Sequence, residues 1–188
     1  MTVSRPVRLT DGDDVVVLVD TADSVVGVAP KLDAHREGRL HRAVSVVLFD
    51  DRGRLLLQRR AFAKYHSGGL WSNTCCGHPR LGESVTDAAR RRLGDELGID
   101  ADGLTRVSDF VYHAELDGGL VEHELDHVVI GDWNGAIKPD PSEVVDTRWI
   151  DWEALLGELT MSPATYTRWT WSVVRHAYRG RENRATAG

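Results

Sequence analysis

The sequence predicts an α+β fold, an α/β/α sandwich with a central mixed β-sheet. Two observations carry this prediction. Short runs of β-branched and aliphatic residues, typical of strands, occur in both halves of the chain. Between them lies a longer segment, residues 84–98, in which apolar residues recur with the period of a helix.

The first predicted strands are residues 15–19, 25–29 and 43–49. The third run is almost wholly apolar, as expected for a central strand that is buried on both faces. The turn Asp50-Asp51-Arg52-Gly53 joins it to a fourth run, residues 54–60, so these two runs are predicted to form a hairpin.

The predicted helix has a signal at each end. Ser84 is suited to the N-cap, with Asp87 three residues further on, and Gly98 is suited to ending the helix. Residues on one side of this helix form an apolar stripe: Val85, Ala88, Ala89, Leu93 and Leu97.

The second half of the chain predicts three more strands and a last helix. Strands are expected at 104–114 and 120–130, joined by Asp117-Gly118-Gly119, and at 147–152. Ser162-Pro163 is expected to open the last helix, because proline is favoured in a first helical turn. Four residues would lie along one side of it: Tyr166, Trp169, Val173 and Ala177.

Length and charge set limits on the class of protein. The 188 residues suit one domain, predicted at 1–178, followed by a polar and disordered tail at 179–188. A net charge of −6, with both signs scattered, argues against a nucleic-acid partner or a membrane-surface protein. No apolar run is long enough for a membrane span, and the first residues lack the apolar core of a signal peptide. We therefore expect a cytoplasmic protein, and the oligomeric state stays open.

Both cysteines of the chain are adjacent, at Cys75 and Cys76. A disulfide between neighbours would close a strained ring, so two free thiols are expected. A structural zinc site is a poor alternative, because the chain has no second ligand pair at the usual spacing.

A second motif overlaps the predicted helix. Gly77, Glu83 and residues 91–99 resemble the Nudix box, in which a loop–helix–loop presents carboxylates to a divalent cation that neutralises a diphosphate. Here Arg92 stands where the box has a glutamate, and Asp95 is the first of the closing acidic pair. Because a cation replaces one carboxylate, we expect diphosphate binding without hydrolysis.

Four separated motifs resemble type I isopentenyl diphosphate isomerase, a Nudix-fold family. Between about Lys31 and Trp152 they read LHRAVSVVLFD, LLQRRAFAKYHSGGLWSN, TCCGHPRLGE and GLVEHELDHV. The resemblance implies a Nudix-like α/β/α sandwich that interconverts isopentenyl and dimethylallyl diphosphate in isoprenoid biosynthesis. The implied route is protonation and deprotonation through a tertiary carbocation, with a small prenyl diphosphate as the binding partner.

The resemblance also implies a divalent metal site with five ligands: His35, His41, His78, Glu122 and Glu124. Three imidazoles and two carboxylates suit an octahedral ion better than closed tetrahedral zinc, and Mn²⁺, Mg²⁺ and Zn²⁺ all stay open as its identity. The sequence adds one supporting observation. Glu122 and Glu124 are two residues apart on a predicted strand, so their side chains face the same side.

The same resemblance assigns the acid–base pair. Cys76 and Glu124 would stand on opposite faces of the alkene, because one group must donate a proton to carbon and the other must accept one. Tyr112 would hydrogen-bond near this glutamate. Cys75 is interpreted as a small buried apolar residue without a catalytic role.

Substrate binding is implied at four basic positions: Lys31, Arg60, Lys64 and Arg92. Glu96 would hold a second cation, Mg²⁺, that arrives with the diphosphate. The remaining histidines are interpreted as surface or loop residues with no role: His66, His113, His123, His127 and His176.

One position departs from the family pattern. Type I isomerases usually carry a tryptophan directly after the Ser/Thr-Pro near the last helix, whose ring can stabilise the carbocation. Here Pro163 is followed by Ala164, and Trp169 starts more than a helical turn further along. This predicts a pocket enlarged at Ala164, which leaves isomerisation or cyclisation of a longer prenyl diphosphate as an alternative function.

Two further functions remain as alternatives. A Nudix hydrolase of nucleoside diphosphate derivatives is disfavoured by Arg92 and by the Cys76-Gly77-His78 triplet. A non-catalytic metal-binding or regulatory domain is disfavoured because Cys76 and Glu124 are both retained.

Overall fold

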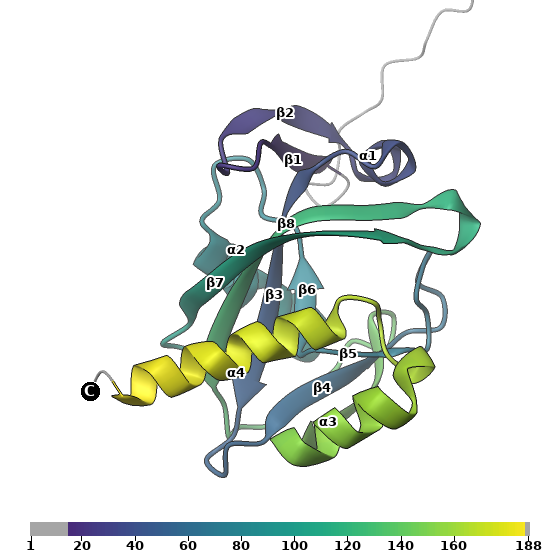
Figure 1. Cartoon of the computed structure of the whole chain (residues 1–188). Helices are drawn as coiled ribbons and strands as arrows, with labels where there is room; N and C mark the ends of the chain where they lie inside the picture. The colour runs from purple at the N-terminus through teal and green to yellow at the C-terminus, as the bar shows by residue number, and fades with distance from the viewer. Residues whose placement is uncertain (1–14, 187–188) are drawn as a thin grey trace, which may run out of the picture.

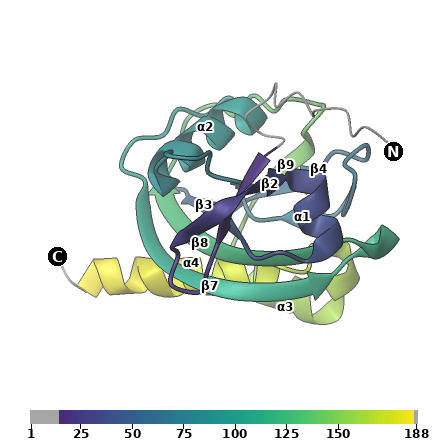
Figure 2. The same cartoon turned by 90° about the horizontal axis from the view of Figure 1, so that it is seen from above.

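The computed structural model describes residues 15–186 and contains one mixed sheet covered by helices on both faces (Figure 1). Seen from above, α2 (Val85–Leu97) lies on one side of the sheet and α4 (Thr170–Thr186) on the other (Figure 2). The predicted α+β sandwich with a central mixed sheet is therefore confirmed.

Strand β3 (His41–Phe49) is the centre of the sheet. It runs parallel to β8 (Val121–Asp132) and antiparallel to β1 (Val15–Val19) and β6 (Cys75–Gly77). Its apolar sequence is explained by this position, because apolar residues packed from both sides cover alternate faces of the strand.

The other strands extend the sheet on both sides of β3. Beyond β1 lies β2 (Val25–Pro30), and β7 (Thr105–Glu115) forms a hairpin with β8 through a short 3₁₀ turn, η1 (Asp117–Gly119). On the far side, β4 (Leu55–Arg60) pairs with β5 (Trp71–Ser72) and with β9 (Val144–Ile150). The strands predicted from the sequence are all present, with ends shifted by a few residues.

Two apolar cores hold the layers together. One lies under α2, where Leu93 and Leu97 pack on Val44 and Val129 of the sheet. The other lies under α4 and α3 (Trp152–Met161). The predicted ends of α2 are also confirmed: the Ser84 hydroxyl accepts the backbone N–H of Asp87, and Gly98 takes φ 61°.

The C-terminal region differs from the sequence prediction. Pro163 opens only a 3₁₀ turn, η2 (Pro163–Thr165), and α4 begins at Thr170. Between them, Tyr166 is extended and pairs with Trp71, the backbone N–H of Thr167 donates to the Trp71 carbonyl at 2.9 Å, and Arg168 and Trp169 form a turn. Helix α4 then continues to Thr186, so the expectation of a disordered tail from residue 179 is wrong for the described residues. Gly180 is buried, and a Cβ there would lie 2.5 Å from Val107.

One short helix was missed and matters for the site. Helix α1 (Lys31–Glu37) follows β2 and ends at Gly38 with φ 61°, and it carries His35. With only seven residues and an exposed Leu32, it has no apolar stripe that a sequence pattern could reveal. Among the described residues, no helix is long and apolar enough to cross a membrane.

Candidate active site

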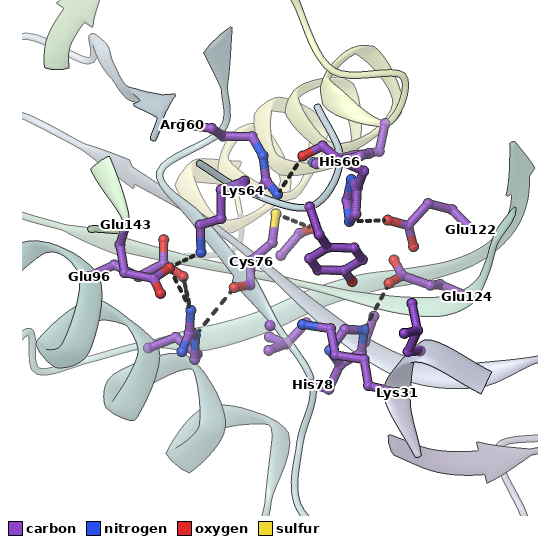
Figure 3. A pocket seen from close by; sticks show the side chains of 18 of the residues that line it. Lys31, Arg60, Lys64, His66, Cys76, His78, Glu96, Glu122, Glu124 and Glu143 are labelled. Carbon is purple, nitrogen blue, oxygen red and sulfur yellow. Dashed lines mark hydrogen bonds and ion pairs between the residues drawn. The ribbon is translucent and has the colours of Figure 1, made fainter. Parts of the chain in front are cut away.

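A cavity of about 570 Å³ opens beside β3. Side chains reach it from α1, β3, β6, α2 and the β7–β8 hairpin, from the loop between β4 and β5 (residues 61–70, called the 61–70 loop), and from the segment before β9 (Figure 3). Segments far apart in the sequence therefore share one pocket. Most of the expected site residues line it: Lys31, Arg60, Lys64, Cys76, His78, Arg92, Glu96, Tyr112, Glu122 and Glu124.

The three expected histidine ligands come together. The donor atoms of His35, His41, His78 and Glu124 all lie within 4.8 Å of one another. His35 Nδ1 lies 2.7 Å from the Lys31 carbonyl, and His41 Nδ1 lies 2.8 Å from the Arg39 carbonyl. A carbonyl only accepts, so in both rings Nδ1 carries the hydrogen and the lone pair of the neutral ring is on Nε2.

The Nε2 atoms of His35 and His41 are buried and have no hydrogen-bond partner. They nevertheless face carboxylates, at 3.3 Å from Glu122 Oε2 and 3.5 Å from Glu124 Oε1. Two acceptors at this distance need a proton or a metal ion between them. This arrangement of imidazoles and carboxylates fits a divalent ion, and a backbone carbonyl behind each ring is the usual way to orient a histidine ligand.

Glu124 is the most connected carboxylate of the site. Its Oε1 lies 3.1 Å from His78 Nε2, and its Oε2 accepts the Tyr112 hydroxyl at 2.8 Å. Burial opposes ionisation, but the adjacent His41 and His78 rings hold the pKa of Glu124 well below its usual range. Burial and the neighbouring Glu124 charge raise the pKa of Glu122 to about 7.

Glu122 does not join the four-residue set directly. The structure groups it with His35 and with His66, whose Nε2 lies 3.3 Å from Glu122 Oε1. His66 lies in a loop, as the sequence interpretation had it, but it is buried and lines the cavity rather than the protein surface. The only sequence signal was its position directly after Lys64-Tyr65, within a stretch that carries the resemblance.

Two of the basic residues, Lys64 and Arg92, contact the same carboxylate, whereas Lys31 lies near His78 and Glu124 (Figure 3). Arg92 donates to Glu96 Oε1 at 2.5 Å and lies 3.4 Å from Glu143 Oε2. Lys64 forms an ion pair with the same Glu143 oxygen. Glu143 lines the cavity and was not anticipated from the sequence, where it is one acid among many.

The Nudix-box glycine is explained by Arg92. A Cβ at Gly77 would lie 2.7 Å from Cγ of Arg92, so a larger residue would push the guanidinium out of the cavity. The box also retains a structural ion pair, in which Arg91 donates to both oxygens of Glu83 at 2.8 and 2.9 Å.

The two cysteines have different environments because neighbouring residues of a strand point to opposite faces. Cys75 is fully buried in the core under α2, whereas Cys76 lines the cavity. The Cys76 Sγ lies 3.3 Å from Asn73 Oδ1 and 3.4 Å from Ser45 Oγ. Burial raises the pKa of the Cys76 thiol to about 12, so the group is a neutral S–H donor at physiological pH.

The prediction of a pocket enlarged at Ala164 is wrong. Ala164 lines a separate groove bounded by Leu159 and Trp171. Trp169 lines the active-site cavity instead, and its indole N–H donates to Ser72 Oγ at 3.0 Å. The sequence argument failed because it assumed that Trp169 lies within the last helix. Residues 166–169 precede α4, so the position of the indole does not follow helical spacing.

Comparison with known proteins identifies the family. The NUDIX domain model matches residues 39–170. The isopentenyl-diphosphate Delta-isomerase 2 of Aromatoleum aromaticum is 50% identical over 84% of this chain and 82% of its own length. The isopentenyl-diphosphate Delta-isomerase of Nocardia farcinica is 50% identical over 86% and 93%. The chain belongs to the type I isopentenyl-diphosphate Delta-isomerase family.

Solved structures agree on the fold of this isomerase family member. The crystal structure of DR0079 from Deinococcus radiodurans superposes with a TM-score of 0.71 at 22% identity, covering 86% of this chain and 98% of that one. The MutT protein of Methanosarcina mazei Go1 gives 0.58 at 22% identity, over 77% and 95%. At this identity the likeness establishes the Nudix fold alone.

Proposed function

We propose that the protein converts isopentenyl diphosphate to dimethylallyl diphosphate. The observation that carries the proposal is that three groups of residues line one cavity: His78, Glu122 and Glu124 of the His/Glu cluster, four basic side chains, and Cys76. A hydrolase needs carboxylates around the diphosphate, whereas this isomerisation needs an acid and a base around a carbon skeleton.

In the proposed reaction a proton is added to the terminal methylene carbon of the alkene. The positive charge then rests on the tertiary carbon, and loss of a proton from the neighbouring methylene forms the new double bond. One C–H bond forms and one breaks, so no net proton is consumed. Cys76 and Glu124 are the proposed pair on the two faces of the alkene, with Tyr112 holding Glu124 in place.

Trp169 is proposed to face the carbocation. Its ring lines the cavity, and its indole N–H is held by Ser72, which fixes the plane of the ring. The π face of an indole attracts a cation by up to about 2 kcal/mol in a desolvated site. A transient tertiary cation in a cavity that excludes water would be stabilised by this contact.

The metal set is proposed to organise Glu124. His35, His41, His78, Glu122 and Glu124 would hold the ion, with Mn²⁺ or Mg²⁺ preferred over Zn²⁺ because the donors are mixed nitrogen and oxygen and exceed four. When bound, this ion would supply positive charge that keeps the buried carboxylates ionised and in place. Any rotation of Glu124 away from the cavity would then break a metal contact.

Diphosphate binding is proposed for Lys31, Arg60, Lys64 and Arg92. Glu96 would hold the Mg²⁺ that accompanies the diphosphate; it is buried, and its Oε2 accepts from Gln58 at 3.0 Å. Arg92 next to Glu96 adds a fixed positive charge where a hydrolytic Nudix site has a further carboxylate. This favours retention of the diphosphate over its hydrolysis. The cytoplasmic location stays a prediction from the sequence.

One incubation tests the proposal. Metal-stripped protein is reconstituted with Mn²⁺ and Mg²⁺, supplied with isopentenyl diphosphate, and followed by ¹H and ³¹P NMR. Appearance of the two allylic methyl signals of dimethylallyl diphosphate, with no free phosphate, is the expected result. Release of phosphate would favour a hydrolase, and an unchanged spectrum would favour a non-catalytic domain.

A further inference from the structure

His66 lies between Glu122, one of the proposed metal ligands, and the ring of Trp169. It belongs to the 61–70 loop, and its side chain is only 6% exposed. Figure 3 shows its ring pointing at Glu122 across the top of the cavity. A buried imidazole that faces a carboxylate of a metal site has a role to be explained.

The two oxygens of Glu122 serve two different imidazoles. Oε1 faces His66 Nε2 and Oε2 faces His35 Nε2, both at 3.3 Å. The donor atoms of His41, His78 and Glu124 group with His35, whereas His66 groups only with His35 and Glu122. His66 is therefore on the outer side of Glu122, away from the centre of the four-residue set.

The tautomer of His66 is consistent with donation to Glu122. Its Nδ1 lies 3.3 Å from the Ser67 hydroxyl, which can donate to an unprotonated ring nitrogen. The hydrogen of the neutral ring then sits on Nε2 and points at Glu122 Oε1. In this arrangement Oε2 is the Glu122 oxygen without a hydrogen-bond partner, so it is the one better placed to accept a metal ion.

The backbone of the 61–70 loop is built to hold this ring. Ser67 and Gly69 have φ 51° and 77°, a left-handed conformation that is rare for a serine. A Cβ at Gly68 would lie 2.6 Å from the Phe62 carbonyl oxygen, so only glycine fits. Arg60 lies 3.4 Å from the His66 carbonyl, and Trp169 meets the His66 ring edge-on at a centroid distance of 5.9 Å.

We propose that His66 is a positioning residue that donates to Oε1 of Glu122 and thereby presents Oε2 to the metal ion, without binding the ion itself. Hydrogen bonds that orient ligating carboxylates commonly contribute as much as a 10- to 100-fold effect on metal affinity. Because the His66 ring also packs against Trp169, it sets the distance between Glu122 and the Trp169 ring. The inference rests on the metal site of the proposed function, but not on the substrate.

The test measures metal binding in the absence of substrate. His66→Ala, His66→Gln and the control His113→Ala, an exposed histidine of β7, are stripped of metal and titrated with Mn²⁺ by calorimetry. We expect His66→Ala to weaken Mn²⁺ binding about 10- to 100-fold. His66→Gln, which keeps an N–H donor, should recover most of that loss, and His113→Ala should bind like the unaltered protein.

Pulsed electron paramagnetic resonance of the Mn²⁺ forms distinguishes positioning from ligation. The number of coordinated imidazole nitrogens should be three in the unaltered protein and three in His66→Ala. A count that falls by one in His66→Ala would make His66 a ligand and overturn the proposal. Unchanged Mn²⁺ affinity in a folded His66→Ala would also overturn it. Failure of isomerisation with normal Mn²⁺ binding would instead count against the proposed function alone.

Discussion

Tyr112 of β7 and Glu124 of β8 are directly opposite each other in the antiparallel hairpin and are joined by a 2.8 Å hydrogen bond. The phenol donates to the carboxylate oxygen that does not face His78. Burial and the nearby Glu124 charge raise the pKa of Tyr112 well above its usual value, so the hydroxyl keeps its proton. The register of β7 and β8 therefore fixes the position of Tyr112 relative to Glu124.

This pair predicts a separation of catalysis from metal binding. In Tyr112→Phe, Oε2 of Glu124 loses its donor, whereas His41 and His78 still hold Oε1. A lost hydrogen bond to a charged group costs about 1.5–3 kcal/mol, so kcat should fall roughly 10- to 100-fold. Calorimetric titration should give an Mn²⁺ affinity within a few-fold of normal. A large loss of Mn²⁺ affinity with little change in kcat would contradict this division of roles.

The adjacent thiols predict opposite outcomes for the same substitution. Cys76→Ala should abolish turnover with the metal content and melting temperature unchanged, because the Sγ lines the cavity. Cys75→Ala should remain active but lose about 1 kcal/mol of unfolding free energy, because it removes a core side chain. Urea denaturation and an isomerase assay on both variants check the prediction. Substantial activity in Cys76→Ala would remove the thiol from the mechanism.

Four variants around Trp169 and Ala164 test the pocket. Trp169→Phe should lower kcat, and Trp169→Ala should lower it further, by about 30-fold if the cation contact contributes ~2 kcal/mol. Trp171→Ala is the matched control on the exposed side of α4. Ala164→Trp should leave the kinetics unaltered because Ala164 lines the separate groove. If Ala164→Trp changes the preferred chain length of the substrate, the assignment of the pocket wall is incorrect.

Glu143 predicts an electrostatic effect on diphosphate binding. Its carboxylate contacts both Lys64 and Arg92, so it competes with a diphosphate for the same cations. In the absence of divalent ions, Glu143→Gln should bind inorganic pyrophosphate more tightly than the unaltered protein, and the gain should shrink as salt is added. Glu153→Gln, on the exposed first turn of α3, is the control. Weaker pyrophosphate binding in Glu143→Gln would instead mean that the carboxylate positions Lys64 and Arg92.

Features set by local chemistry were predictable from the sequence. The caps of α2 at Ser84 and Gly98 and the apolar run of β3 follow from short-range rules. Strand β6, which separates Cys75 from Cys76, was not predicted. The metal and basic residues followed from the family resemblance, and all of them except Lys31 and His35 lie inside one of the quoted motifs. Their convergence on one cavity could be expected for the same reason.

Features set by tertiary contacts were not predictable. His66 reaches Glu122 because the 61–70 loop, which contains two left-handed residues, places its ring in the cavity. Trp169 reaches the pocket because the hydrogen bond from the Thr167 N–H to the Trp71 carbonyl keeps the residues before Thr170 out of helix α4. In both cases a long-range contact overrides the local sequence pattern. The helical spacing assumed for Trp169 therefore led to the wrong prediction that Ala164 borders the substrate pocket.

The central claim is that an acid and a base exchange protons with the substrate carbons, and isotope incorporation tests it most directly. The reconstituted protein converts isopentenyl diphosphate in D₂O, and the first product formed is examined by ¹H and ²H NMR. The account predicts one deuterium in a methyl group of dimethylallyl diphosphate, and no product from Cys76→Ala or Glu124→Gln. Product formed at the normal rate without deuterium would contradict it, because the hydrogen would then have moved within the substrate.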